Sequence, residues 1–301
     1  MNEEETINLD EFHQAANHLR SLSFSITPVS TNSILNTITK RNIYLKCENF
    51  QRTGSFKTRG AVNAVLNAIK RDSNIKGFVT RSSKNKMDAI QHYGAEIVFC
   101  EPTPTGQTTI SLQISQERDF LFIPPSDHRD IIAGQETIAL ELLEQVPNLD
   151  AILVSVSSGG LISGVAIYAK HINPNIRIYA CVPEGKMLEE CLKEEKRLWP
   201  EPPQFLQTKC ETCRSQQCGK LTFPIICSLV EKQVFNISDQ AMIDAIRFAF
   251  EQLKLVIELP AGLPLATILS QIDRLDSTIH NIGIILCGGN IDLNQPLPWH
   301  G

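Results

Sequence analysis

Short apolar runs alternate with amphipathic segments along most of the chain. The apolar runs predict strands at residues 42–47, 77–80, 95–100, 121–123, 151–156, 176–182 and 282–286. Apolar positions at helical spacing predict helices at residues 9–22, 61–69, 86–93, 131–145, 161–170, 239–253 and 264–275. Residues 188–220 are polar and rich in cysteine, so we expect an irregular segment there. Because strands that are apolar on both faces alternate with helices, the pattern predicts an α/β fold with a mostly parallel sheet.

Composition and charge narrow the class of protein. A chain of 301 residues with 42% hydrophobic and 20% charged residues is ordinary for a globular protein of two domains or one large α/β unit. The net charge is −5 and no basic stripe occurs, so we expect no nucleic-acid partner. No apolar run approaches the ~20 residues of a membrane span. The acidic start, MNEEETINLDEF, does not resemble a signal peptide, so we expect a cytoplasmic protein whose nine cysteines are thiols.

Two glycine turns directly follow predicted strands. Residues 157–160 (SSGG) follow the strand at 151–156, and residues 287–290 (CGGN) follow the last strand. In a parallel sheet, ligands bind at the carboxyl ends of the strands, and glycine lets the backbone approach a phosphate closely. Neither turn is a GxGxxG or a Walker A motif, and close packing is the alternative explanation for each.

Lys57 lies between a polar, glycine-containing loop at residues 51–57 and the helix at 61–69. Most lysines are solvated surface residues, which is the simpler interpretation. A lysine at a helix start can also bond to a carbonyl cofactor, and that chemistry needs a phosphate cradle and a group facing a pyridine nitrogen. The two glycine turns provide candidates for both.

Several segments together resemble one enzyme family. Residues 46–61 (KCENFQRTGSFKTRGA) resemble the lysine motif of the serine racemases and serine/threonine dehydratases, which are pyridoxal-phosphate enzymes of fold type II. In the same order along the chain, further segments are similar to motifs of this family: residues 131–135 (IIAGQ), 157–164 (SSGGLISG), 258–262 (ELPAG) and 287–290 (CGGN).

The resemblance implies a tryptophan synthase β-like α/β fold with two open parallel-sheet domains. Residues 1–77 and 127–301 would form the large, cofactor-binding domain, and residues 78–126 a smaller, truncated one. The family is commonly dimeric, so a homodimer is expected by resemblance.

Site roles also follow from the resemblance, residue by residue. Lys57 would bond covalently to the aldehyde of pyridoxal 5'-phosphate and act as the base on one face of the substrate Cα. Ser83 would be the acid or base on the opposite face, and Phe56 would form a wall of the cofactor site. Cys287 would face the pyridine nitrogen. The phosphate would be bound by Ser157, Ser158, Gly159 and Gly160.

One segment of the family pattern is absent. After Ser83 the family continues with Gly-Asn-His-Gly, whereas this chain passes to residues 84–90 (KNKMDAI), which resemble a later point. About thirty residues, roughly one β–α unit, are therefore missing. The missing loop normally binds the substrate carboxylate and the ring oxygen of the cofactor. Asn85 aligns with the resumed helix, so we do not assign it that role.

Metal binding is the least determined part of the pattern. The family's divalent cation site, for Mg²⁺ or a similar ion, begins with a Glu where Val182 stands here. The carboxylates of Glu184, Glu189 or Glu190 are possible substitutes, and a solvated acidic helix is the alternative. Cys210, Cys213, Cys218 and Cys227 are either ligands of a zinc ion or free thiols in a divergent loop. Glu258 is either a pocket acid or a residue that terminates a helix.

These features favour an enzyme acting on a small amino acid. By resemblance it would convert L-serine to D-serine, or eliminate the hydroxyl of serine, threonine or 3-hydroxyaspartate to give a 2-oxo acid and ammonia. One alternative is a catalytically impaired pseudoenzyme or splice form that retains cofactor or partner binding. Another is a faulty gene model that folds poorly.

Overall fold

The computed structural model describes residues 9–22, 24–82, 94–292 and 297–299 of the chain. Its main sheet has six strands in the order β1-β2-β8-β5-β6-β7. Only β1 is antiparallel to its neighbour. The strands are β1 (Val29–Ser30), β2 (Asn42–Cys47), β5 (Ala151–Ser155), β6 (Arg177–Pro183), β7 (Val234–Ile237) and β8 (Asn281–Leu286). The predicted parallel α/β sheet is confirmed.

Helices connect and cover these strands. The α-helices are α1 (Leu9–Ser21), α2 (Ser33–Thr39), α3 (Lys57–Arg71), α5 (Pro104–Arg118), α6 (Arg129–Gln145), α7 (Gly160–Ile172), α8 (Leu188–Glu194), α9 (Thr222–Leu229), α10 (Asp239–Phe248) and α11 (Leu259–Gln271). Short 3₁₀ or π-helical turns are η2 (Glu48–Phe50), η4 (Glu211–Cys213), η5 (Ala249–Leu253) and η6 (Ile272–Arg274). Ser238 is the N-cap of α10, because its Oγ accepts a hydrogen bond from the backbone N–H of Ala241 (3.2 Å).

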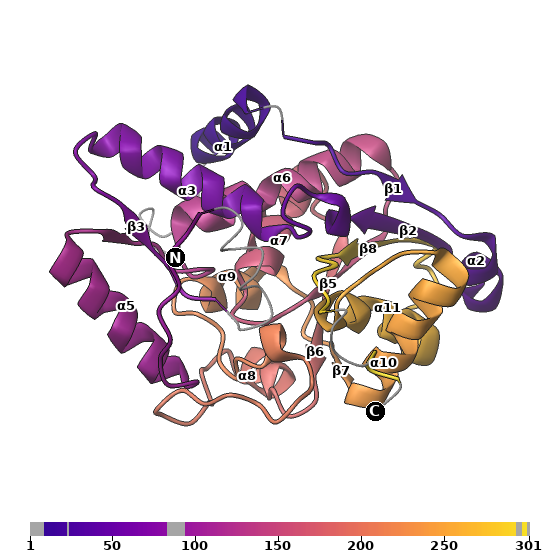
Figure 1. The fold of residues 1–301 in the computed structure, drawn as a ribbon. Helices are drawn as coiled ribbons and strands as arrows, with labels where there is room; N and C mark the ends of the chain where they lie inside the picture. The colour runs from indigo at the N-terminus through magenta and orange to yellow at the C-terminus, as the bar shows by residue number, and fades with distance from the viewer. Residues whose placement is uncertain (1–8, 23, 83–93, 293–296, 300–301) are drawn as a thin grey trace.

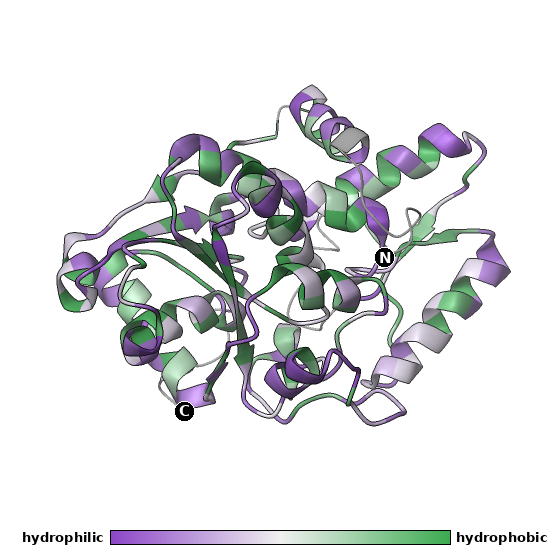
Figure 2. Cartoon of the chain, turned by 180° about the vertical axis from the view of Figure 1, so that it is seen from behind, coloured by the Kyte–Doolittle hydropathy of each residue, from purple (hydrophilic) through white to green (hydrophobic). Residues whose placement is uncertain are grey.

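The sheet is buried between two layers of helices. Figure 1 shows α10 and α11 on one side and α6 and α7 on the other. α11 packs on β5, β6, β7 and β8, while α7 packs on β5 and α6 packs on α7 and α3. All five residues of β5 are buried, and Figure 2 shows the central strands as the most hydrophobic part of the cartoon. Burial on both faces explains why the strand sequences are apolar runs and do not alternate.

A second, smaller sheet lies apart from the main one (Figure 1). It contains β3 (Phe78–Val79) and β4 (Leu121–Phe122), which are parallel, with α5 packed against both. These elements lie within residues 78–126. We keep the division into a large domain of residues 1–77 and 127–301 and a small one of residues 78–126 as a proposal.

Several local predictions were wrong or incomplete. Residues 95–100 form no strand, and Phe99 there is 73% exposed. Within the described residues the small sheet has two strands, so this run finds no partner for its backbone groups. α8 interrupts the segment predicted to be irregular and buries Leu188, Cys191 and Leu192, which is helical spacing. The predicted helix at 86–93 lies outside the described residues.

The elements that were missed include α2, α5, α9 and β7. α5 has weak apolar periodicity in its sequence, PTGQTTISLQISQER. Its start is instead specified by Thr103, whose Oγ1 accepts a hydrogen bond from the backbone N–H of Gly106 (3.0 Å), and by proline at the first helical position. No helix of the described residues combines the length and the apolar composition that crossing a membrane requires.

The α6–α7 contact buries a carboxyl group. A Cβ added to Gly164 of α7 would lie 2.6 Å from the carbonyl oxygen of Ile132 and 2.9 Å from the backbone nitrogen of Glu136, so glycine permits this close approach. Glu136 is 2% exposed, and its Oε1 has no hydrogen-bond partner among the described residues. Burial raises the pKa of Glu136 well above its ordinary value of 4.5, and the charge of Glu11 adds to the rise.

Glu136→Gln is expected to stabilise the protein increasingly as the pH rises. The wild-type carboxyl resists ionisation in the fold but ionises freely in the unfolded chain, so the wild type loses stability above about pH 4.5, until the pH reaches the raised pKa. Glutamine has nearly the same shape and no proton to lose. We expect a gain of at least about 1 kcal/mol at pH 8, measured by denaturant unfolding at several pH values. The exposed Glu144→Gln on the same helix is the control, and an advantage of Glu136→Gln that does not change with pH would contradict the prediction.

Candidate active site

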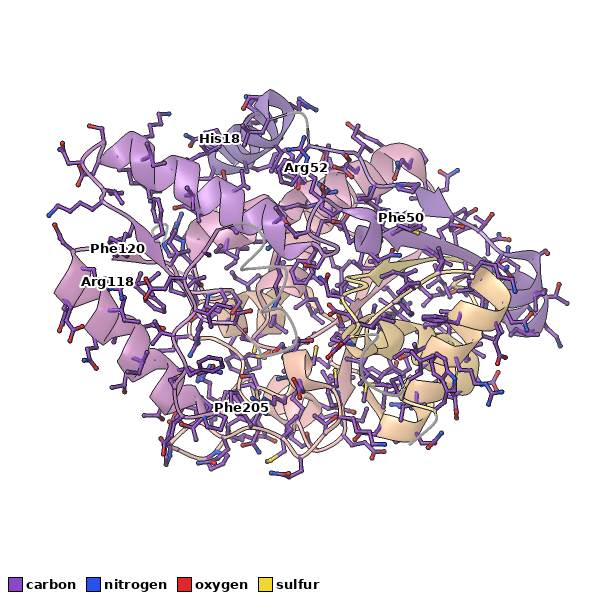
Figure 3. All side chains as sticks on the ribbon, viewed as in Figure 1. His18, Phe50, Arg52, Arg118, Phe120 and Phe205 are labelled. Carbon is purple, nitrogen blue, oxygen red and sulfur yellow. The ribbon has the colours of Figure 1, made fainter. Side chains whose placement is uncertain are left out.

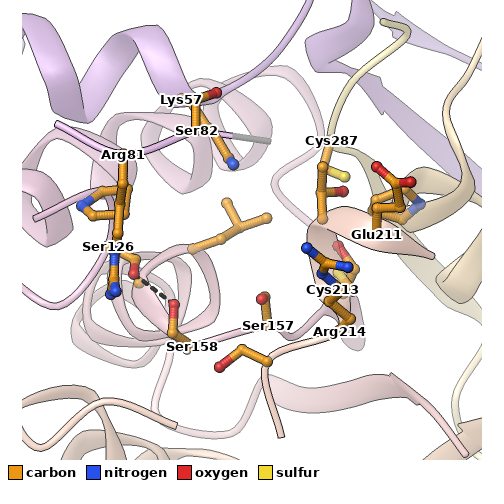
Figure 4. Close-up of a pocket in the computed structure, with 18 of the residues that line it drawn as sticks. Lys57, Arg81, Ser82, Ser126, Ser157, Ser158, Glu211, Cys213, Arg214 and Cys287 are labelled. Atoms are coloured by element: carbon orange, nitrogen blue, oxygen red, sulfur yellow. Dashed lines mark hydrogen bonds between the residues drawn. The ribbon is translucent and has the colours of Figure 1, made fainter. Parts of the chain in front are cut away.

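Three segments far apart in the sequence meet at one cavity. Lys57 at the start of α3, the turn at residues 157–160 between β5 and α7, and Cys287 directly after β8 all line it. Figure 4 shows the Lys57 side chain directed into the cavity, with Ser157 and Ser158 across from it and Cys287 to one side. Phe56, Gly159 and Gly160 line the same cavity. The structure therefore brings together every predicted site residue that it describes.

Backbone contacts hold Lys57 beside the end of β8. Ser55 forms a β-bridge with Gly288, and the Phe56 N–H donates to the carbonyl oxygen of Cys287 (3.0 Å). The Gly289 N–H donates to the carbonyl oxygen of Gly54 (2.9 Å). These three contacts join the loop before α3 to the turn after β8. The position of Lys57 relative to Cys287 is thus fixed by main-chain hydrogen bonds.

A buried ion network anchors α3 just behind Lys57. Arg59 is fully buried, and its guanidinium binds Glu48 of η2 at 2.8 Å through both Nε and Nη2. It also binds Glu141 of α6 at 2.6 and 2.8 Å, and Glu141 pairs in turn with buried Lys46 at 2.6 Å. Burial opposes the charge on Arg59, but the two carboxylates outweigh it and raise its pKa above the usual value. The first turn of α3 is therefore fixed to two other elements.

The turn at residues 157–160 has the properties of an anion cradle. Gly159 has a left-handed φ of 104° and precedes α7, whose first N–H groups have no partner within the helix. The Ser158 Oγ and Ser126 Oγ are hydrogen-bonded at 2.5 Å, and the Ser158 carbonyl oxygen accepts bonds from the Gly219 N–H (2.9 Å) and Thr222 Oγ1 (2.6 Å). These contacts hold the turn in place. The first N–H groups of α7 lie at the end of the helix that lines the cavity.

Gly159→Ala is expected to weaken cofactor binding by at least about tenfold. A Cβ at this position would lie 2.7 Å from Cδ1 of Ile226 and 2.8 Å from Oγ1 of Thr222, and the left-handed φ adds strain. The turn would have to move, which would displace the amide groups. Titration of the apoprotein with pyridoxal 5'-phosphate measures the effect. Gly94→Ala separates strain from the clash, since Gly94 also has a positive φ but no atom of the described residues within 4 Å of the added Cβ. Equal affinities of the two variants would contradict the prediction.

The segment at residues 210–215 forms a wall that the sequence analysis did not assign to the site. Glu211, Cys213 and Arg214 line the cavity. The guanidinium carbon of Arg214 lies over the ring of Phe205, 4.1 Å from the ring centroid, and Figure 3 marks the position of Phe205. The pKa of Cys213 is lowered, mainly by a hydrogen bond with the Cys210 thiol. Burial opposes this shift, and the positive charges of Lys186 and Lys57 add to it. The irregular sequence gave no periodic signal that could have placed these residues.

Arg81 and Ser82 line the opposite side of the cavity. The Arg81 guanidinium donates to Oγ1 of Thr108 (2.7 Å) and to the Pro104 carbonyl oxygen (3.5 Å). Burial lowers the pKa of Arg81, and only the charge of Asp127 opposes this shift. Within the described parts of the chain, neither Arg81 nor Arg214 forms an ion pair with a carboxylate. The cavity therefore contains two cationic groups available to an anionic ligand.

Comparison with known proteins places this geometry in a family. The model of a family described as "Pyridoxal-phosphate dependent enzyme" matches residues 21–85 and 79–288. The chain belongs to the pyridoxal-phosphate dependent enzymes. The two matched segments overlap at residues 79–85, a stretch that includes Ser83, after which the missing block was predicted.

Individual relatives agree with this assignment. The chain is 36% identical to human serine racemase over an alignment of 311 residues, which covers 92% of this chain and 89% of the relative. Since that alignment is longer than the 301-residue chain, part of it is gaps in this chain. A pyridoxal 5'-phosphate-dependent aspartate racemase has a TM-score of 0.94 at 40% identity, covering 97% of this chain and 98% of its own. Maize serine racemase has a TM-score of 0.88 at 31% identity, covering 95% and 94%. The predicted family and fold type are confirmed.

The residues present fit pyridoxal 5'-phosphate, the cofactor of this family. An amine, Lys57, and an anion cradle at residues 157–160 lie at one cavity. Gln135 also lines the cavity, and its buried Oε1 has no partner among the described residues. Cys287 is 2% exposed at the cavity wall. Together these groups provide a covalent attachment point, donors for the phosphate and a neutral side chain for the ring.

The remaining predicted residues have different outcomes. Ser83 and Asn85 lie outside the described residues. Glu258 lines the cavity, as a pocket acid would, and it begins α11 as its N-cap residue, so it does not terminate a helix. In the part of the chain that the structure covers, no three or more His, Cys, Asp or Glu side chains are grouped to hold a metal ion, and the four cysteines considered for zinc are free thiols.

Proposed function

We propose that this enzyme interconverts L- and D-serine, and eliminates the hydroxyl of serine or a related 3-hydroxy amino acid to give a 2-oxo acid and ammonia. The observation that carries the proposal is the convergence of Lys57, the glycine turn and Cys287 on one cavity, in a chain 36% identical to serine racemases. The bound cofactor supplies an electron sink for the charge left when the substrate Cα loses its proton.

The chain's own residues divide the remaining tasks. Lys57 holds the cofactor covalently and moves the proton at one face of Cα, while Ser83 serves the other face. Phe56 forms a wall of the cofactor site. The donors for the phosphate are the backbone and side chains of Ser157, Ser158, Gly159 and Gly160. The neutral Cys287 leaves the ring nitrogen largely unprotonated, and this suits racemisation and elimination. We further propose a cytoplasmic homodimer, on the resemblance to the family.

Product analysis tests the proposal. The purified chain with pyridoxal 5'-phosphate is incubated with L-serine or L-threonine in D₂O. Chiral chromatography measures the D-isomer, a coupled dehydrogenase assay measures the 2-oxo acid, and mass spectrometry measures deuterium at Cα. We expect deuterium in recovered serine together with at least one product. A chain that binds the cofactor but gives neither deuterium nor product would establish the binding-only alternative.

Aspartate is a second candidate substrate, favoured by the two guanidinium groups of Arg81 and Arg214 at the cavity. A second carboxylate on the substrate would pair with one of them. The similar solved structure at 40% identity is described as an aspartate racemase. We therefore include L-aspartate in the same assay.

Arg81→Met is expected to lower kcat/KM for aspartate by at least about tenfold, and to change the value for serine much less. Methionine keeps the length of the side chain but removes the charge. The control is Arg118→Met, since Arg118 pairs with Glu96 on the exposed surface (2.5 Å). An equal fall for serine and aspartate would refute a role of Arg81 in selecting an acidic side chain.

A further inference from the structure

Lys186 is a buried cation without a carboxylate partner. It is one of the three largest fully buried side chains, together with Arg59 and Lys46. Arg59 and Lys46 are paired with carboxylates. Among the described residues Lys186 has no such partner, and the titratable groups that influence it are the thiols of Cys218, Cys213 and Cys191. Burying a cation in this way is costly unless it is fully hydrogen-bonded.

Two backbone carbonyl groups accept hydrogen bonds from Lys186. Its Nζ lies 2.5 Å from the carbonyl oxygen of Ser215 and 3.3 Å from that of Gln216. An ammonium group has three donors and no acceptor, so converging carbonyl oxygens suit it. These are also the ligands that a hard metal cation takes. The ammonium group therefore occupies a site built for a cation.

The turn after β6 directs Lys186 inward. Its neighbours Gly185 and Met187 both have left-handed φ values, 84° and 56°. A left-handed φ is uncommon and energetically unfavourable for a residue such as methionine. The Lys186 carbonyl oxygen accepts a hydrogen bond from the indole N–H of Trp199 (2.6 Å), which holds the turn. The strained turn thus places the Lys186 amine against the carbonyl groups of residues 215 and 216.

The same region does not fit a divalent cation. Val182, at the position where the family resemblance predicts the first carboxylate ligand, is apolar and 0% exposed. Glu184 and Glu190 are exposed, and Glu189 pairs with Lys193 at 2.7 Å. Besides the two carbonyl oxygens, the titratable groups near Lys186 are thiols, which are soft ligands, whereas Mg²⁺ and Ca²⁺ take six or more oxygen ligands, carboxylates among them. Mg²⁺ binding, an expectation of the sequence analysis, finds no set of ligands here.

We propose that Lys186 is a built-in replacement for the divalent cation, so that this enzyme assembles its site without a metal ion. The Lys186 amine binds the carbonyl groups of Ser215 and Gln216. These contacts hold the adjoining residues 213–215, all of which line the cavity, in place. A valine in place of a carboxylate removes one negative charge, and Lys186 places an amine at the site. Burial lowers the pKa of this amine, while two carbonyl oxygens, at 2.5 and 3.3 Å, accept hydrogen bonds from it.

A neighbouring contact shows the same principle. Arg197 donates to the carbonyl oxygens of Cys218 (2.8 Å) and Gly219 (2.9 Å), two residues beyond the last carbonyl that Lys186 binds. Two basic side chains thus bind four carbonyl groups within residues 215–219. This segment leads to the Gly219 N–H, which donates to the Ser158 carbonyl oxygen of the phosphate turn (2.9 Å). The inference goes beyond the proposed reaction, since it concerns how the cavity wall is held.

Metal chelation of the wild-type protein is the first test. The melting temperature and the affinity for pyridoxal 5'-phosphate are measured after treatment with EDTA and after addition of Mg²⁺, Mn²⁺ or Ca²⁺. We expect no change in either quantity, and elemental analysis of the purified protein to find substoichiometric metal. A fall in melting temperature with EDTA, or a rise with any of the three cations, would overturn the proposal. These readouts do not depend on catalysis, so they remain valid if the proposed reaction is wrong.

The second test removes the ammonium. Lys186→Met keeps the length of the side chain, loses both carbonyl contacts and is expected to lower the melting temperature by at least about 5 °C. It should also expose the segment at residues 210–219 to limited proteolysis. Lys254→Met is the matched control, because Lys254 donates to the Glu251 carbonyl oxygen (2.6 Å) on the exposed surface. Equal melting temperatures and cleavage patterns for the two variants would refute the role of Lys186. If Lys186→Met does not fold, the chelation test decides alone.

Discussion

Replacing Lys57 with alanine is expected to lower the turnover of serine by roughly a thousandfold or more. The Lys57 amine is directed into the cavity between the phosphate turn and Cys287, and the variant removes both the attachment point of the cofactor and the base at one face of Cα. The phosphate turn and the rest of the fold stay in place, so we expect residual, non-covalent cofactor binding. The rates of D-serine and 2-oxo acid formation measure the loss.

Chemical mapping makes this prediction specific to one residue. Borohydride reduction of the wild-type holoenzyme should leave a pyridoxyl group on the peptide that contains Lys57, and Lys57→Ala should leave none there. Lys70→Ala is the control, because Lys70 is an exposed lysine in the last turn of the same helix. It should keep both the label and the activity. A label on another lysine, Lys186 included, would refute the assignment of Lys57 and with it the proposed reaction.

Arg59→Met is expected to lower the free energy of unfolding by about 3–5 kcal/mol. The substitution leaves the buried carboxylate of Glu48 without its guanidinium partner, and among the described residues it leaves Glu141 with Lys46 as its one cationic partner. Uncompensated buried charges account for most of the loss. Arg59 lies two residues after Lys57 in α3, so we also expect weaker cofactor binding. Urea unfolding of the apoprotein measures the stability effect, and cofactor titration measures the second.

The control for Arg59 is an ion pair of similar chemistry in solvent. Arg247 and Glu251 lie 2.7 Å apart with side chains 56% and 52% exposed, so Arg247→Met should cost less than about 1 kcal/mol. If the two variants unfold at the same urea concentration, the buried network is not the anchor described here. A normal affinity for the cofactor in a destabilised Arg59→Met would limit the role of Arg59 to stability.

Local signals predicted those elements that are regular and apolar. β2 was predicted at residues 42–47 and is observed as Asn42–Cys47, because its apolar residues Ile43, Leu45 and Cys47 are fully buried in the sheet. The helix α5 was not predicted, because its start is specified by Thr103 and Pro104 and its apolar residues show little helical periodicity. The strand predicted at residues 95–100 was wrong, because an apolar run does not form a strand unless a neighbouring strand pairs with its backbone groups.

The site was predicted in the same uneven way. Lys57, Gly159, Gly160 and Cys287 lie in motifs of a few residues, and the structure brings them to one cavity. Arg81, Arg214 and Lys186 carry no such motif. Their importance depends on which distant residues they approach. Lys186 and Ser215, for example, are 29 residues apart in the sequence and hydrogen-bonded in the fold.

The sequence by itself determined the α/β class, the lysine and glycine motifs and the position of the missing block, because each can be recognised from a short stretch of consecutive residues. The tertiary structure alone decided how the cavity wall is held and which charges face the ligand. Burial, desolvation and carbonyl contacts arise only when separate segments pack together. The buried ammonium of Lys186 is the clearest case, since its sequence neighbours give no sign of the two carbonyl groups that it binds.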